Sequence, residues 1–151
     1  MSIFNALRRV LDTKALAAAT EAGLAGKIQL MNEETVKDKR AVHAEFWFRT
    51  GGSKQCELGP NTSLEMTVGI FQFTVYSPEN VGSGSGTAAA DILRARFNRK
   101  QWMVDPYGYV NTQVANVKTP MSGPVNGQFV TIVDGTFYYY HRDPDAGDFR
   151  E

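Results

Sequence analysis

The run "AVHAEFWFRT" constrains the fold more than any other part of the chain, because its side chains alternate in kind. Val42, Ala44, Phe46 and Phe48 fall on one side of an extended chain. The side chains between them are mixed: His43, Glu45, Trp47 and Arg49. Successive strand residues point to opposite faces of a sheet, so the pattern predicts a strand. Parallel sheets covered on both faces read as continuous apolar runs, so we expect a largely antiparallel sheet with one face uncovered.

A second apolar run, "LEMTVGIFQFTVY", changes phase at Gly69. Its apolar residues stand at even positions before Gly69 and at odd positions after it. Because a shift of one residue turns every side chain to the other face, we expect a glycine bulge at Gly69 or a break into two strands there. Between the two runs, Thr50–Gln55 predicts a hairpin-type loop, with a short strand near Cys56–Leu58.

Two segments show the spacing of amphipathic helices. Residues 3 to about 22 place apolar side chains three and four apart, with Ser2 as a candidate N-cap and Gly23 and Gly26 as stop signals. Residues from about 87 to 98 predict a second helix, capped by Ser85 or Thr87. The apolar stripe expected on that helix is Ala89, Ile92, Leu93, Arg96 and Phe97.

Further strands are expected near Ile28 and Leu30, over "YVNTQVANVKT" and over "QFVTIVDGTFYYYH". Within the last of these, Asp134–Gly135 fits either a two-residue hairpin turn or a bulge in one long strand. The order of elements predicts an α+β fold, a single mostly antiparallel (mixed) sheet with two helices packed on one face. We expect one domain over residues 1–141 and a polar, disordered tail over 142–151.

Composition narrows the class of protein. The chain is 42% hydrophobic, enough for a core, and its 16 basic and 16 acidic residues leave a formal net charge of zero. Proteins that hold nucleic acid by neutralising phosphates are usually basic, so specific nucleic-acid binding is not expected. The single cysteine, Cys56, fits an intracellular compartment. No secretory signal or membrane span is expected, since no apolar run approaches about 18 residues.

The stretch "SPENVGSGSGT" invites comparison with phosphate-binding loops, because it lies between a predicted strand and a predicted helix. Its glycines, Gly82, Gly84 and Gly86, alternate, and no lysine precedes Thr87 as a P-loop requires. The third glycine also comes one residue too early for a dinucleotide fingerprint. We interpret the stretch as a flexible connection between strand and helix. A small-ligand or nucleotide site at Gly82–Gly86 is kept as the alternative from another functional class.

The sequence gives little indication of catalysis or metal binding. It has two histidines, His43 and His141, and no G-x-S-x-G nucleophile motif. The histidines and acids show no metal-ligand spacing. We therefore expect a protein that is not an enzyme and has no cofactor or metal, with both histidines at the surface or half-buried.

Basic and aromatic residues point to assembly instead. Successive rings of "FYYY" must face opposite sides of a strand, so some of these tyrosines should be exposed or at an interface, where tyrosine is favoured. The basic residues near position 97 also suit the C-terminal end of a helix, where positive charge offsets the dipole. The candidate interaction residues are Arg49, Lys54, Gly82, Gly84, Gly86, Arg94, Arg99, Lys100, Tyr138 and Tyr140.

The segment "GIFQFTVYSPENVGSGSGTAAADILRARF" resembles the tail-terminator (tail-completion) proteins of long-tailed bacteriophages. In that family a strand of the form G-x-x-Q-x-x-V leads into a P…G-x-G loop, then into a helix with small residues at its start and a phenylalanine at its end. The matching positions are Gly69, Gln72, Val75, Pro78, Gly84 or Gly86, Ala88–Ala90 and Phe97. The resemblance covers most of the chain, from the first helix to about His141.

The resemblance implies a structural protein that forms a ring, usually hexameric, on the end of the tail tube. Such a ring stops tube polymerisation and presents a surface to the head connector. The implied partners are further copies of the chain, the tail tube protein and the head–tail connector, with DNA passing through the ring. The implied location is the virion tail at its junction with the head, after assembly in the bacterial cytoplasm. Another neck or head–tail connector protein is the alternative in the same structural class.

Overall fold

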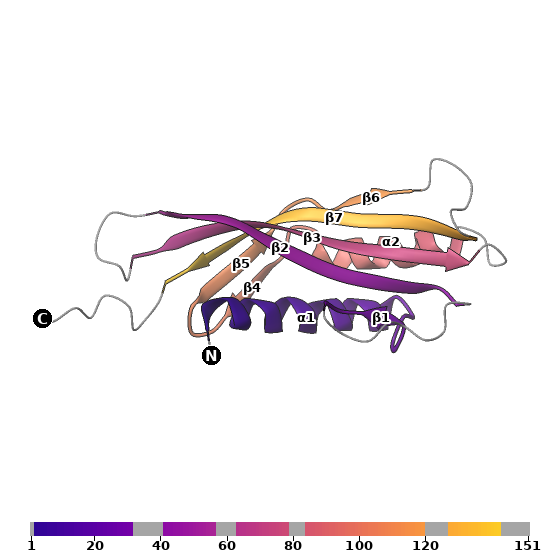
Figure 1. Ribbon diagram of the computed structural model, residues 1–151, viewed down its shortest axis with the longest axis horizontal. Coiled ribbons are helices and arrows are strands. Elements are labelled where there is room, and N and C mark those ends of the chain that lie inside the picture. Colours follow the sequence, from indigo (N-terminus) through magenta and orange to yellow (C-terminus); the bar gives the residue numbers. More distant parts are fainter. Residues whose placement is uncertain (1, 32–40, 57–62, 79–83, 120–126, 143–151) are drawn as a thin grey trace, which may run out of the picture.

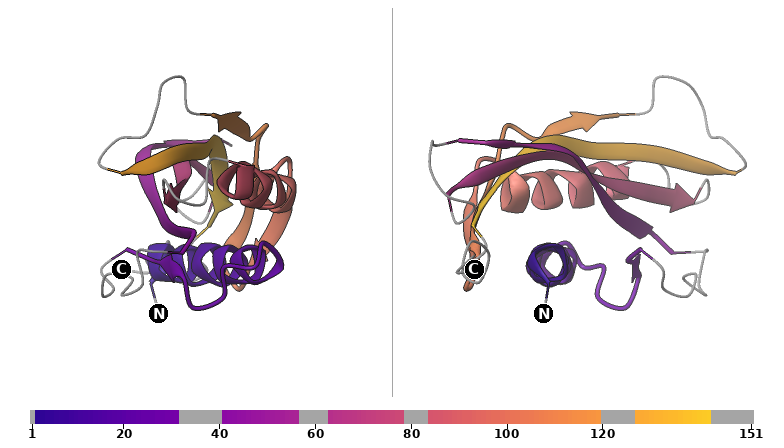
Figure 2. Two further views of the ribbon diagram at one scale, coloured as in Figure 1. Left: turned by 90° about the vertical axis from the view of Figure 1, so that its right-hand side faces the viewer. Right: turned by 60° about the vertical axis from the view of Figure 1, so that its left-hand side comes forward.

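The computed structural model describes residues 2–31, 41–56, 63–78, 84–119 and 127–142. It shows an α+β fold, in which a curled, seven-stranded sheet has both helices on one side (Figures 1 and 2). The elements are α1 (Ile3–Glu21), β1 (Ile28–Gln29), β2 (His43–Gln55), β3 (Glu65–Pro78), α2 (Gly84–Phe97), β4 (Gln101–Val104), β5 (Gly108–Thr112), β6 (Asn116–Lys118) and β7 (Gln128–His141). The strand order is β1-β2-β3-β7-β5-β4, and β6 also pairs with β7. Among these pairings only that of β1 with β2 is parallel, so the predicted fold class is confirmed.

Helix α1 begins and ends where its sequence signals predict. The hydroxyl of Ser2 accepts a hydrogen bond from the amide of Asn5 at 3.1 Å, which satisfies one of the free donors of the first turn. At the other end Gly23 takes a left-handed φ of 78°, and its amide donates to the Thr20 carbonyl. Leu7 and Leu11 are fully buried against the sheet.

Helix α2 begins earlier than predicted. Gly84 is its first residue, so Ser85 and Thr87 lie inside the first turn, and the predicted caps are wrong. The predicted stripe is also partly wrong, because Ile92 and Arg96 are exposed. The side chains that face the core are Gly86, Ala89, Ala90, Leu93 and Phe97. Helix α2 and strand β3 approach closely at the start of this face, since a Cβ on Gly86 would stand only 3.0 Å from the Cβ of Ser77. The first residues of this face are therefore small.

The predicted hairpin loop at Thr50–Gln55 is wrong, because β2 continues through it to Gln55. The pairing of β2 with β3 shifts register between Thr50 and Ser53, and resumes with Ser53 opposite Thr67. The glycines that suggested a turn therefore form a bulge, whose one extra residue is accommodated without ending the ladder. Cys56 follows the strand rather than starting a new one, and residues 57–58 lie outside the described ranges.

The strands β3 and β7 form the centre of the sheet and pair without interruption. Their partners run from Glu65 with His141 to Pro78 with Gln128. No bulge or break occurs at Gly69. At Asp134–Gly135 there is neither a turn nor a bulge, so these predictions are wrong.

The two central glycines make room for aromatic rings across the ladder. Gly69 pairs with Phe137, and Phe71 pairs with Gly135. A Cβ on Gly69 would collide with the Phe137 ring, and one on Gly135 would stand 2.8 Å from the Phe71 ring. Each glycine therefore leaves space for the ring of the residue opposite it on the paired strand. Such a close approach explains why a glycine stands inside a strand.

The core lies between the helices and the inner face of the sheet, and Phe97 is at its centre. The Phe97 ring contacts the rings of Phe46, Phe71, Phe73 and Trp102, with centroid distances of 5.0 to 5.7 Å. All of these phenylalanines are essentially fully buried. The last residue of α2 therefore fixes the helix on the sheet.

The run "YVNTQVANVKT" forms two short strands rather than one. Strand β5 pairs with the C-terminal part of β7, and β6 pairs with Ile132–Asp134. Between them the Gln113 amide donates to the Thr136 carbonyl at 2.8 Å. Near the end of the described chain the Arg142 amide donates to the Tyr107 carbonyl. The rest of the predicted tail lies outside the described residues.

Candidate assembly surface

The face of the sheet turned away from the helices, here called the outer face, is not covered by either helix (Figure 2). The change of phase at Gly69 accounts for its character. Because β3 runs straight on, the even-numbered residues Met66, Val68 and Ile70 lie on the outer face, and Phe71 and Phe73 lie in the core. Ile70 is 45% exposed. The strand therefore carries apolar side chains on both of its faces. This explains the change of phase in the sequence, which a strand with one buried face would not show.

Tyrosines extend the apolar character of the outer face. Tyr138 and Tyr140 lie half-buried on it, whereas the alternate residues Phe137 and Tyr139 are fully buried, so the predicted alternation is confirmed. The Tyr140 ring stacks on Tyr109 of β5, with centroids 5.1 Å apart. Met103 of β4 pairs with Tyr109 and is 60% exposed.

Two of the predicted basic residues also lie on the outer face. The Arg49 guanidinium lies over the indole of Trp47, 5.8 Å from the ring centroid, and the residue is exposed. Lys54 is exposed and pairs with Met66. Arg49, Lys54, Tyr138 and Tyr140 therefore come together, as four of the ten predicted interaction residues.

A hollow of about 200 Å³ opens in the middle of the outer face. Its lining residues are Trp47, Ile70, Phe71, Gln72, Asn116, Asp134, Gly135 and Thr136. Asp134 is the one charged residue among them, and its carboxylate accepts from the Lys118 ammonium at 2.8 Å. Ligand pockets usually measure about 300–1,000 Å³. This hollow is smaller, and suits a single side chain better than a whole ligand.

The remaining predicted interaction residues do not join this surface. The Arg94 guanidinium donates to the Ala115 carbonyl at 2.8 Å, and Arg99 is exposed with a φ of 55°. Lys100 lines a separate depression of about 300 Å³ beside Trp102. Gly84 and Gly86 lie in the first turn of α2, not in a loop, and Gly82 lies outside the described residues.

Both histidines are buried, which contradicts the prediction from sequence. His43 and His141 are 5% and 3% exposed. His43 stacks on Tyr76 with centroids 5.0 Å apart, and its Nδ1 lies 3.0 Å from the Ala41 carbonyl oxygen. His141 is covered by Phe4, whose ring centroid lies 5.6 Å away. Residues from other parts of the fold bury both rings, and the alternation within a strand could not predict these contacts.

His141 belongs to a chain of side-chain hydrogen bonds. Its Nε2 lies 2.9 Å from the Thr67 hydroxyl oxygen, which lies 2.5 Å from the Ser53 hydroxyl oxygen. Burial lowers the pKa of His141, and Glu65 acts in the opposite direction. In a catalytic triad the base contacts the nucleophile and an acid orients the base. Here Thr67 stands between Ser53 and the imidazole, so the arrangement differs from a triad, in which the base contacts the nucleophile directly. Nδ1 of His141 has no hydrogen-bond partner within the described part of the chain.

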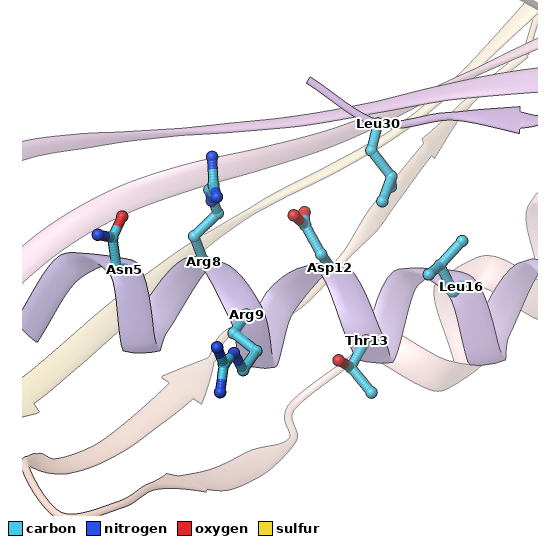
Figure 3. Close-up of a pocket in the computed structure, with 7 residues that line it drawn as sticks. All are labelled: Asn5, Arg8, Arg9, Asp12, Thr13, Leu16 and Leu30. Carbon is cyan, nitrogen blue, oxygen red and sulfur yellow. The ribbon is translucent and has the colours of Figure 1, made fainter. Parts of the chain in front are cut away.

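A wider depression lies along α1, between this helix and Leu30 (Figure 3). It measures about 500 Å³, and its lining residues are Asn5, Arg8, Arg9, Asp12, Thr13, Leu16 and Leu30. Figure 3 shows that the Leu30 side chain points towards the helix. Two exposed apolar side chains of α1, Phe4 and Leu16, are 44% and 45% exposed.

The described residues contain no group of three metal-ligating side chains. Within the same residues, neither helix is long and apolar enough to cross a membrane.

Comparison with known proteins extends the description of the fold. No protein-family model matches the chain, and no curated protein matches it. A solved structure, 16% identical in sequence, superposes with a TM-score of 0.70 over 95% of this chain and 97% of the other. The name of that protein states no activity. At this identity the likeness shows a shared fold from end to end and nothing further.

Proposed function

We propose that this chain is a structural tail terminator of a long-tailed bacteriophage, which assembles into a ring on the end of the tail tube. The ring would stop tube polymerisation and offer its other side to the head connector. The proposal starts from the family resemblance of residues 69–97, which includes the glycine, the glutamine and the final phenylalanine of that motif. Phe97 is at the centre of the core, so the matching helix end has a structural role in this fold.

The observation that carries the proposal is the outer face of the sheet. It presents Met103, Ile70 and two half-buried tyrosines to solvent without a covering layer from the described residues. Contiguous apolar and aromatic surface of this kind marks interaction sites. The net charge of zero adds no long-range repulsion between copies.

The free edge of β2 supports assembly as well. Strand β1 pairs with β2 only at Ala44 and Glu45, so among the described strands the rest of that edge has no neighbour. Exposed edges offer unpaired backbone groups to another chain. A ring needs contacts between two different surfaces of neighbouring subunits. An open edge and an uncovered face supply surfaces of different kinds.

The test combines oligomeric state with tube growth. Light scattering behind size-exclusion chromatography and negative-stain microscopy should detect rings, either in the free protein or on adding tube protein. In a polymerisation assay, the chain should shorten the tubes at substoichiometric amounts, because one ring blocks one tube end. A chain that stays monomeric at every concentration and leaves tube length unchanged would end the proposal. Binding to the connector but not to tube ends would favour the alternative, a neck protein.

A further inference from the structure

The first turn of α1 packs over a buried histidine at one end of the sheet. The His141 ring contacts the rings of Tyr139 and Phe4, with centroids 4.6 and 5.6 Å away. The Tyr139 hydroxyl donates to the Ile3 carbonyl at 2.9 Å, which holds the same turn against β7. His141 is 3% exposed, whereas Phe4 is 44% exposed. The side chain that covers the histidine from the helix is therefore already partly in water.

Within the described residues, one of the two ring nitrogens of His141 has a hydrogen-bond partner and the other has none. Nε2 lies 2.9 Å from the Thr67 hydroxyl oxygen, which lies 2.5 Å from that of Ser53 at the exposed bulge of β2. With Nε2 as the donor, each hydroxyl can donate onward, and Ser53 can donate to water. Nδ1 is buried without a partner. A second proton on the ring would place a charged N–H there with no acceptor, which is costly.

The groups around the ring do not compensate for that second proton. Glu65 of β3 stands opposite His141 in the ladder and favours the charged ring, but burial is the larger effect and lowers the pKa of His141 below its usual 6.5. Strand β5 presents Gly108, which has no side chain, and β2 presents an uncharged hydroxyl. Burial raises the pKa of Tyr139 on β7, so its phenol stays neutral. Helix α1 brings its N-terminal end, which is partially positive, and its first charged side chain is Arg8.

We propose that His141 is an acid-sensitive latch, whose protonation opens the first turn of α1 and leaves the rest of the fold closed. Water reaches Nδ1 with the least loss of burial when Phe4 moves, because helix ends are the parts of a fold that open most easily. The opening ends before Leu7, which is fully buried. On the sheet side, the ladders to β3 and β5 hold the histidine in place. The latch belongs to the single chain and does not depend on the proposed ring.

Proton NMR tests the cover over the histidine. The chain has two histidines, so His43→Gln assigns both ring signals. In Phe4→Ala the titration midpoint of His141 should rise towards 6.5, because water then reaches Nδ1. The matched control is Leu16→Ala, which removes an equally exposed side chain from the same helix and should leave the midpoint unchanged. Equal midpoints in the two variants would overturn the inference.

Amide exchange locates the opening. The informative amides are those of Asn5 and Ala6, which donate to the Ser2 hydroxyl and carbonyl. After correction for intrinsic rates, their exchange should rise below pH 6.5 by up to about tenfold per pH unit, because each opening takes up one proton. His141→Gln, which does not titrate in this range, should abolish the rise. An equal rise in His141→Gln, or one shared by the amides of β3 and β7, would show that the latch is wrong.

Discussion

The close fit between Gly69 and the Phe137 ring gives a prediction of defined size. Replacing Gly69 by alanine places a methyl group where the ring and the Arg49 carbonyl oxygen, 2.7 Å from the new atom, already stand. Forcing an extra methyl into a filled core costs about 1–3 kcal/mol. The lower backbone freedom of alanine in the unfolded chain offsets about 0.4–1 kcal/mol of that cost. We expect a net loss of about 1.3 kcal/mol in the free energy of unfolding, which is the difference between the midpoints of these two ranges.

Urea denaturation and thermal melts measure the loss. For a chain of this length, about 1.3 kcal/mol lowers the Tm by about 3–5 °C. The matched control is Gly52→Ala, since no heavy atom lies within 4 Å of its added Cβ, and it should be neutral or slightly stabilising. In the double variant Gly69→Ala with Phe137→Leu, the smaller side chain should relieve part of the clash. The loss of stability in the double variant should then be smaller than the sum of the losses in the two single variants by about 0.5–3 kcal/mol. Equal stability of Gly69→Ala and Gly52→Ala would refute the packing argument.

Three further predictions concern single groups. Burial lowers the folded-state pKa of His141 below its usual 6.5, so its contribution to stability is fully present above pH 6.5 and is lost as the pH falls from there towards the folded pKa; urea midpoints between pH 7.5 and 5 should drop more for the wild-type chain than for His141→Gln, and equal drops would show that other groups are responsible. Tyr139→Phe removes the hydroxyl that donates to the Ile3 carbonyl at 2.9 Å and should cost about 1 kcal/mol, whereas Tyr138→Phe should change monomer stability by less than about 0.5 kcal/mol; similar costs for the two would contradict the assigned hydrogen bond. Adding ATP or NAD should leave the Tm unchanged, and an upward shift that Gly84→Leu abolishes would favour a nucleotide site over an assembly role.

Local patterns in the sequence predicted much of the fold, because they report local geometry. The cap at Ser2, the glycine stop at Gly23 and the alternation of Phe46 and Phe48 each depend on a few neighbouring residues. The helix periods and the half-polar strand together were enough for the α+β class. The faces of "FYYY" followed for the same reason.

The errors lie where distant segments decide the outcome. Thr50–Gln55 has the composition of a turn, and it is a strand because β3 pairs with it across a bulge. Gly69 and Gly135 looked like breaks, and they instead make room for rings from other strands. The candidate surface was half predicted: its tyrosines followed from alternation, whereas the hollow is formed by residues of β2, β3, β6 and β7 that only the folded sheet brings together.

The continuous ladder between β3 and β7 also has a consequence for the order of folding. Its partners are far apart in the chain, from Pro78 with Gln128 to Glu65 with His141, and α2 and three strands lie between them. Contacts of such long range form slowly, since a large loop must close first. Until β7 emerges from the ribosome, β3 has β2 on one edge and unpaired backbone groups along the other. Nascent chains at this stage are at risk of pairing with one another, so cellular yield should depend on chaperones that shield the β2–β3 pair until β7 is made.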